Sequence, residues 1–186
     1  MSENTHRATG LTLDGDREIP TPSDLVNEGA VTATTERIEH DSSDYCANGT
    51  NGWAVTDVVD DEGRHLLLVN DELGIAMLPA EAVESDDWAA TARAAPENYT
   101  GISAELDSVL AVRTVEHLRP EDDEPHNQTY RLVCRASPTG GEFLECKQTA
   151  DNGSDGFRAG WFETLPAGIS PAPEAGPRND LELALR

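Results

Sequence analysis

Acidic residues far outnumber basic residues in this chain of 186 residues, and the imbalance limits how the chain can fold. There are 36 Asp and Glu residues against 13 Lys and Arg residues, which gives a formal net charge of -23. Apolar residues make up 37% of the sequence, which is below a typical globular domain but well above a disordered chain. The composition therefore allows one modest core, and the surplus carboxylates must lie outside it.

Salt decides how well such a chain tolerates its own charge. Repulsion between exposed carboxylates destabilises a compact state in dilute buffer. At molar salt the screening length falls to about 3 Å, and most of this repulsion disappears. Lys147 is the only lysine among the basic residues, and this scarcity resembles the acidic proteins of halophilic archaea that accumulate salt. An ordinary acidic bacterial protein is the alternative.

The charge and the apolar pattern also bear on partners and location. The chain has no basic stripe to offset its negative charge, so we expect no nucleic-acid partner and no anionic membrane surface. Residues 1–22 lack the apolar segment of a signal peptide, and no stretch approaches the roughly 20 apolar residues of a membrane span. The expected location is the cytoplasm.

Apolar periodicity predicts an α+β protein. A helix is expected over 88–95, where Asp86 and Asp87 precede an alanine-rich run and Pro96 should end or kink it. A turn is expected at 137–141, and Asn179 should cap a short helix over 180–186. The strands at 53–59 and 64–70 should pair as a hairpin. Strands are predicted at 31–35, 53–59, 64–70, 73–78, 106–115, 129–136 and 157–162.

Several short motifs appear in a characteristic order between Gly52 and Pro166, and together this stretch resembles a Nudix domain. The motifs are Trp53-Ala54-Val55 followed by D-D-E-G-R and L-L-L-V, Leu78-Pro79, Thr100-Gly101-Ile102, and Trp161-Phe162 with Leu165-Pro166. The resemblance implies a central mixed β-sheet flanked by helices. It also suggests four parts: a flexible acidic segment (1–22), an extension with a candidate strand (23–51), the Nudix-like domain (52–169), and a linker with a short helix (170–186).

The catalytic box of the Nudix family is poorly preserved. In that family, the segment R-E-U-x-E-E-x-G-U, where U is a bulky apolar residue, supplies glutamates that hold Mg²⁺ or Mn²⁺, and the metal activates water. Aligned from Gly101, residues 94–99 lack the arginine and all three glutamates. A register shifted by one residue places Arg93 on the arginine, Glu97 on one metal-binding glutamate and Asn98 on the next. The box glycines are replaced by residues 80–82.

Four carboxylates could still form a metal site by this resemblance. Glu84, Asp86 and Glu97 are the predicted metal ligands, with Asp87 able to stand in for Asp86, and Glu97 and Asp86 are the predicted catalytic residues. For each of them, a solvated surface charge is the competing interpretation.

Other polar and thiol residues have weaker assignments. Glu116 lies where some relatives place an auxiliary acid, whereas His65 is expected to be structural. His117 and His126 are expected to be solvent-exposed loop residues, with contact to a ligand at the mouth of the fold as the alternative. Trp53 is expected to pack in the core or at its rim, with base stacking as the alternative. Cys134 is expected in the core, while Cys46 and Cys146 have no assigned role.

Three functions remain open from the sequence. The first is a Nudix-like protein with a degenerate box, impaired or inactive, that binds a nucleotide-like ligand or a protein partner. The second is a divergent Mg²⁺- or Mn²⁺-dependent pyrophosphohydrolase that cleaves a nucleoside diphosphate derivative such as ADP-ribose. The third is an unrelated α+β domain. A homodimer is one oligomeric state left open.

Overall fold

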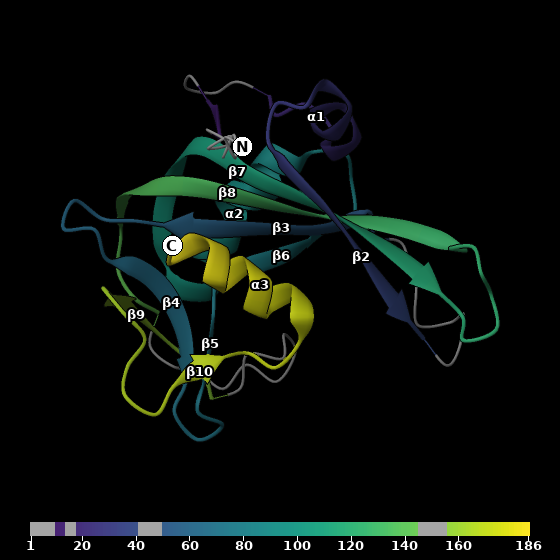
Figure 1. Cartoon of the computed structure of the whole chain (residues 1–186). Coiled ribbons are helices and arrows are strands. Elements are labelled where there is room, and N and C mark those ends of the chain that lie inside the picture. Colours follow the sequence, from purple (N-terminus) through teal and green to yellow (C-terminus); the bar gives the residue numbers. More distant parts are fainter. Residues whose placement is uncertain (1–9, 14–17, 41–49, 145–155) are drawn as a thin grey trace, which may run out of the picture.

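The computed structural model describes residues 10–13, 18–40, 50–144 and 156–186 (Figure 1). The predictions for Cys46, Cys146 and most of residues 1–22 concern segments outside the described part of the chain. The elements in chain order are β1 (Leu11–Thr12), α1 (Pro22–Glu28), β2 (Thr32–Glu39), β3 (Gly52–Val58), β4 (His65–Asn70), β5 (Ile75–Met77), β6 (Ala80–Val83), α2 (Trp88–Thr100), β7 (Ile102–Leu118), β8 (Asn127–Gly141), β9 (Arg158–Phe162), β10 (Ser170–Pro171) and α3 (Ala175–Ala184).

The larger sheet is mixed and carries the centre of the molecule. Its strand order is β1-β7-β8-β3-β6, and β2 also pairs with β7. The β2–β7 and β3–β8 pairs are parallel, whereas β7–β8, β3–β6 and β1–β7 are antiparallel. In Figure 1, β2 runs beside the half of β7 that extends away from the body. The residues before Gly52 thus contribute two strands to this sheet.

The smaller sheet has the order β10-β5-β4-β9, and it corrects the predicted hairpin. Both strands of that hairpin exist, as β3 and β4, but they belong to different sheets. Only an isolated bridge between Val59 and His65 joins them, after which β4 pairs with β5 and β9. The continuous apolar run of β4 explains the difference, because Leu66 packs in one core cluster and Leu67 in the other.

Alternation along the central strands places two apolar clusters on opposite faces of the larger sheet. Ala54 and Leu132 face the cluster that contains Trp88 and Ala92 of α2. Their neighbours Val55 and Val133 face the cluster that contains Leu181 and Ala184 of α3. The two helices therefore cover opposite faces of the sheet (Figure 1). The predicted α+β class, with a central mixed sheet flanked by helices, is confirmed.

The proline in α2 does not end the helix, which corrects the expectation for Pro96. The helix continues to Thr100, and Gly101 follows with a left-handed φ of 82°. Proline has no N–H to donate to the carbonyl four residues earlier. Here that carbonyl belongs to Ala92, and it accepts a hydrogen bond of 2.6 Å from Thr56 Oγ1 of β3. A tertiary donor thus replaces the helical donor that Pro96 lacks.

Several other elements differ from their predictions, and strands β1, β6 and β10 were not predicted. The predicted turn at 137–141 belongs to β8, where Pro138 pairs with Ala104 beside a register shift that tolerates its missing N–H. The last helix begins at Ala175, and Asn179 lies inside it and caps nothing. Helix α1 was not predicted, although Thr21 accepts from Asp24 N as its N-cap and Pro22 occupies its first turn.

Two further observations concern membranes and the thiol. Among the described residues, no helix combines the length and the apolar character that crossing a bilayer requires. Cys134 is fully buried in the cluster below α2, as predicted, and burial raises the pKa of its thiol to about 12. This cysteine is therefore a small apolar core residue.

Candidate ligand groove between β6 and α2

A groove opens at the edge of the larger sheet, where strand β6 meets helix α2. It coincides with the segment that resembles the Nudix box. Its lining combines two aromatic side chains, two glutamates and several small residues. These residues are Trp53, Glu81, Ala82, Glu84, Ser85, Ala90, Thr91, Ala94 and Tyr99.

The local strand pairing places the aromatic and acidic residues of the groove. Strand β6 pairs antiparallel with β3, so that Ala82 lies opposite Trp53 and Glu81 lies opposite Ala54. Gly52 makes the close approach of β3 to β8 possible, because a Cβ at that position would lie 1.9 Å from the carbonyl oxygen of Tyr130. Its φ of 144° also lies where side chains are rarely tolerated. Trp53 follows directly and keeps 40% of its surface exposed.

A neutral amide holds one of the two groove carboxylates. Asn98 Nδ2 of α2 donates a hydrogen bond of 2.8 Å to Glu81 Oε2 of β6. Tyr99, the next residue, has a raised pKa because its hydroxyl is partly buried and because the Glu81 carboxylate lies near it. The Tyr99 phenol therefore stays protonated at neutral pH and can donate a hydrogen bond into the groove.

The predicted metal ligands occupy separate positions around the groove. Glu84 is exposed and lines it. Asp86 accepts a hydrogen bond of 3.2 Å from Asn51 Nδ2, and Asp87 caps α2 by accepting from Ala90 N at 2.9 Å. Glu97 is exposed on α2 and does not line the groove.

The residues of the box do not fit a gathered metal centre. Within the described ranges, no three His, Cys, Asp or Glu side chains lie close enough together to hold one ion. The family's metal chemistry needs carboxylates converging from the helix, and here the helix presents the amide of Asn98 instead. The roles of Glu84, Asp86 and Glu97 as metal ligands, and of Asp86 and Glu97 in catalysis, stay predictions.

The remaining candidates are engaged elsewhere in the molecule. Glu116 forms an ion pair with Arg37 at 2.8 Å. His65 Nδ1 lies 2.7 Å from Asp57 Oδ1, where the buried Asp57 also pairs with Arg135, as a structural role predicts. His117 is not a loop residue, because it lies in β7 and is hydrogen-bonded to His40 and Thr129. None of the three lines the groove.

Sequence reasoning missed two residues of the groove. Glu81 was noted only as the replacement of a box glycine, because strand β6 was not predicted and its pairing with β3 cannot be read from the sequence. Tyr99 was noted only as a departure from the box. Trp53 was expected to pack in the core or at its rim, with base stacking as the alternative, and its exposure places it at the rim.

Comparisons with known proteins give similarity at the level of structure. No family model matches the sequence, and no curated protein does. The chain is similar to the MutT protein from Bacillus halodurans (18% identity, 70% of this chain and 78% of that chain, TM-score 0.49). It is also similar to a UDP-X diphosphatase (16% identity, 87% of this chain and 68% of that chain, TM-score 0.44). A third similar structure is a Sinorhizobium meliloti 1021 protein provisionally described as an oxidoreductase (18% identity, 72% of this chain and 39% of that chain, TM-score 0.43).

Proposed function

We propose that this chain is a Nudix-like protein that binds a nucleotide-like ligand in the groove between β6 and α2 without hydrolysing it through the box. The observation that carries the proposal is the hydrogen bond from Asn98 to Glu81. In the register that keeps Arg93, Asn98 stands where a metal-binding glutamate would be. An amide there is neutral, and its N–H occupies the one carboxylate that remains on the facing strand.

The lining of the groove suits the nucleoside part of such a ligand. Trp53 presents an exposed indole, and stacking on an aromatic ring contributes about 1–3 kcal/mol per base. Glu81 and Glu84 offer carboxylate oxygens that accept from ribose hydroxyls or an exocyclic amino group. Both glutamates repel phosphates, so we expect a bound phosphate chain to point into solvent.

A divergent hydrolase is the second candidate, and one observation favours it. Glu81 and Glu84 both line the groove, and Mg²⁺ is commonly held by only one or two carboxylates together with waters and substrate phosphates. In this alternative, the ion would enter with the nucleotide, and Mg²⁺ or Mn²⁺ would be required for turnover.

A combined binding and turnover assay separates the two candidates. We suggest measuring the quenching of Trp53 fluorescence by ADP-ribose in molar KCl, with and without Mn²⁺, alongside a hydrolysis screen of ADP-ribose, dinucleoside polyphosphates and oxidised dNTPs. Trp88 and Trp161 also fluoresce, so the change is assigned by a Trp53→Phe variant. The proposal predicts saturable quenching and no turnover. It also predicts a roughly tenfold weaker affinity for Trp53→Ala, since one stacking contact is lost, and this affinity is measured by titration calorimetry because the variant lacks the reporting indole.

The control is Leu73→Ala, an exposed apolar residue at a turn outside the groove, which should bind ligand like the wild type. Metal-dependent turnover that disappears in Glu81→Gln or Glu97→Gln would establish the hydrolase and reject the non-hydrolysing proposal. Absence of both quenching and turnover across the whole set would reject both.

A further inference from the structure

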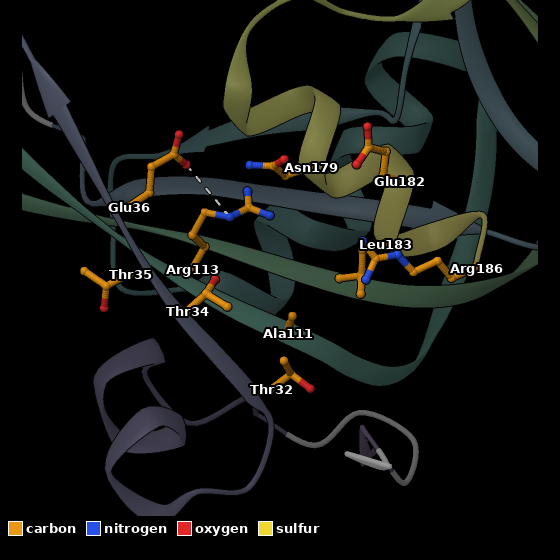
Figure 2. Close-up of a pocket in the computed structure, with 10 residues that line it drawn as sticks. All are labelled: Thr32, Thr34, Thr35, Glu36, Ala111, Arg113, Asn179, Glu182, Leu183 and Arg186. Carbon is orange, nitrogen blue, oxygen red and sulfur yellow. Dashed lines mark ion pairs between the residues drawn. The ribbon is translucent and has the colours of Figure 1, made fainter. Parts of the chain in front are cut away.

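A second groove lies on the opposite face of the sheet, between strands β2 and β7 and helix α3 (Figure 2). It is a hollow of about 410 Å³, and eight of the ten residues that line it are polar or charged. The residues around it are Thr32, Thr34, Thr35, Glu36, Ala111, Arg113, Asn179, Glu182, Leu183 and Arg186. Since α2 covers the other face, this groove is separate from the one described above.

The strand and helix periodicities bring these side chains together. Thr32, Thr34 and Glu36 alternate along β2 and therefore share one face, where Thr32 and Thr34 lie opposite Ala111 and Arg113 of β7. On α3, the lining residues Asn179, Glu182 and Leu183 have the spacing of a single helical face, and Arg186 follows the end of the helix. Figure 2 shows Asn179 and Glu36 extending toward each other above Arg113.

Arg113 forms the floor of the groove and belongs to a buried ion-pair network. Arg113 Nη1 donates to Asp180 Oδ1 at 2.7 Å, and Arg131 Nε donates to Asp180 Oδ2 at 2.8 Å. Asp180 is completely buried and Arg113 is 8% exposed. Two guanidinium groups share one carboxylate, so the floor carries one excess positive charge and is fixed by charge-assisted hydrogen bonds.

Glu36 balances this charge but has an unused acceptor. Its Oε2 atom is buried, yet it accepts no hydrogen bond from any part of the chain that the structure describes. The Arg113 Nε atom lies 3.9 Å away, which is an ion-pair distance beyond hydrogen-bonding reach. A buried acceptor without a donor is unfavourable. A ligand N–H placed between Glu36 and Asn179 would remove that penalty.

The helix side of the groove offers polar groups that the fold does not use. Asn179, Glu182 and Arg186 are exposed, and their side chains form no hydrogen bond or ion pair with another described residue. Asn179 lies within α3, whereas Arg186 lies two residues beyond its last residue, Ala184. The groove thus has the free acceptor of Glu36 near one end and the unpaired guanidinium of Arg186 at the other.

We infer that this groove binds a small extended zwitterion, with a primary ammonium group at Glu36 and a carboxylate at Arg186, as in an ω-amino acid or a short peptide. A purely anionic ligand would meet the carboxylates of Glu36 and Glu182. A purely cationic ligand would leave Arg186 unused. A zwitterion complements both ends.

Three matched probes test this inference in about 1 M KCl, where general attraction of amines to an acidic chain is screened. They are 6-aminohexanoate, pentylamine and hexanoate, and binding is followed by amide chemical shifts of the full chain. We expect 6-aminohexanoate to bind at least about tenfold more tightly than pentylamine, hexanoate not to bind, and the shifts to fall on β2 and α3.

Variants assign the two ends of the ligand. Glu36→Gln should weaken 6-aminohexanoate by about tenfold or more, since a charged hydrogen bond is lost. Glu39→Gln is the matched control, because it removes the same charge from an exposed position on the opposite face of β2. Arg186→Ala should lower the affinity for 6-aminohexanoate to that for pentylamine and leave pentylamine unchanged.

Equal binding of 6-aminohexanoate and pentylamine to the wild type would overturn the inference, as would shifts outside β2 and α3. If Glu36→Gln does not fold, the exposed-site variants Arg186→Ala and Asn179→Leu still decide it, and unchanged affinity in both contradicts the assignment. Ligand binding in the groove between β6 and α2 does not enter this test, so either site can fail alone.

Discussion

Asn98 and Glu81 join helix α2 to edge strand β6 by a hydrogen bond of 2.8 Å beside the candidate groove. With a glutamate at position 98, the same pair would be two facing carboxylates. A neutral donor satisfies Glu81 without any ion. The pair also anchors the last turn of a helix that contains a proline.

Restoring a second carboxylate should change the response of the groove to metal. In Asn98→Glu, two carboxylates face each other without an N–H between them. We expect lower stability in dilute buffer because like charges repel, and partial recovery on adding Mn²⁺, which binds only where the carboxylates converge. Thermal unfolding with and without Mn²⁺ measures both effects.

Asn98→Gln is the control for that variant, since it keeps the amide and adds one methylene. It should show no Mn²⁺-dependent stabilisation beyond that of the wild type. If Asn98→Glu gains nothing from Mn²⁺ either, the two side chains do not face each other closely enough to resemble a metal-binding pair.

The bond from Thr56 to Ala92 should be worth more than an ordinary buried hydrogen bond. Because Pro96 has no N–H, Thr56→Val would leave the Ala92 carbonyl without its donor. An unsatisfied buried acceptor costs about 1–3 kcal/mol, and we expect the free energy of unfolding to fall by that amount. Urea unfolding in molar KCl measures the change.

A double-mutant cycle checks this explanation directly. Pro96→Ala supplies a helical N–H to Ala92, so Thr56→Val should cost much less in the Pro96→Ala background than in the wild type. Equal costs in the two backgrounds would mean that Thr56 stabilises the fold by packing and not by replacing the missing helical donor.

The histidines near the end of β7 should make that region sensitive to acid. His40 Nε2 lies 2.9 Å from His117 Nδ1, and the two rings stack with centroids 5.1 Å apart. Partial burial lowers the pKa of His117, and the neighbouring His40 and His126 lower it further. The unfolded chain therefore binds this proton at a higher pH than the folded chain does.

The sign of the pH effect follows from linkage. Stability is fully present above the unfolded pKa of about 6.5, and it is lost as the pH falls through the lower folded pKa. We expect the amide protection factors in β2 and in the paired ends of β7 and β8 to be lower at pH 5 than at pH 7.5. Each protection factor is taken relative to the intrinsic exchange rate at its own pH. His117→Gln should reduce this acid sensitivity, and an unchanged pH dependence in that variant would place its origin elsewhere.

Sequence patterns predicted the parts of the fold that depend on one strand or one helix at a time. Alternation from Thr129 to Ala136 correctly placed Cys134 in the core, and the alanine-rich run predicted α2. The errors arose where a distant residue decides the structure. Pro96 stays helical because Thr56 supplies a donor, and β4 leaves β3 because its side chains enter both clusters.

The candidate sites likewise combine features that the sequence shows with features that only tertiary contacts decide. The scarcity of box carboxylates was readable from the sequence, but the contact between Asn98 and Glu81 depends on how α2 packs on β6. The groove beside α3 was not predicted at all. Arg113, Asp180 and Glu36 are far apart in the chain, and no local pattern distinguishes them from the surface charges of an acidic protein.

Salt should stabilise this protein if its acidic surface is an adaptation to high ionic strength. With a formal net charge of -23, exposed carboxylates repel one another in dilute buffer. Screening by salt removes about 1 kcal/mol of repulsion energy from each close like-charged pair. The buried pairs of Arg113 and Arg131 with Asp180 are screened little, so salt should not weaken them appreciably. We therefore expect the free energy of unfolding to rise by roughly 1 kcal/mol or more between 0.1 and 2 M KCl, measured by urea unfolding. Sucrose of equal osmolality is the control, since excluded solutes also favour compact states without screening charge; equal stabilisation by sucrose and KCl would remove charge screening as the cause.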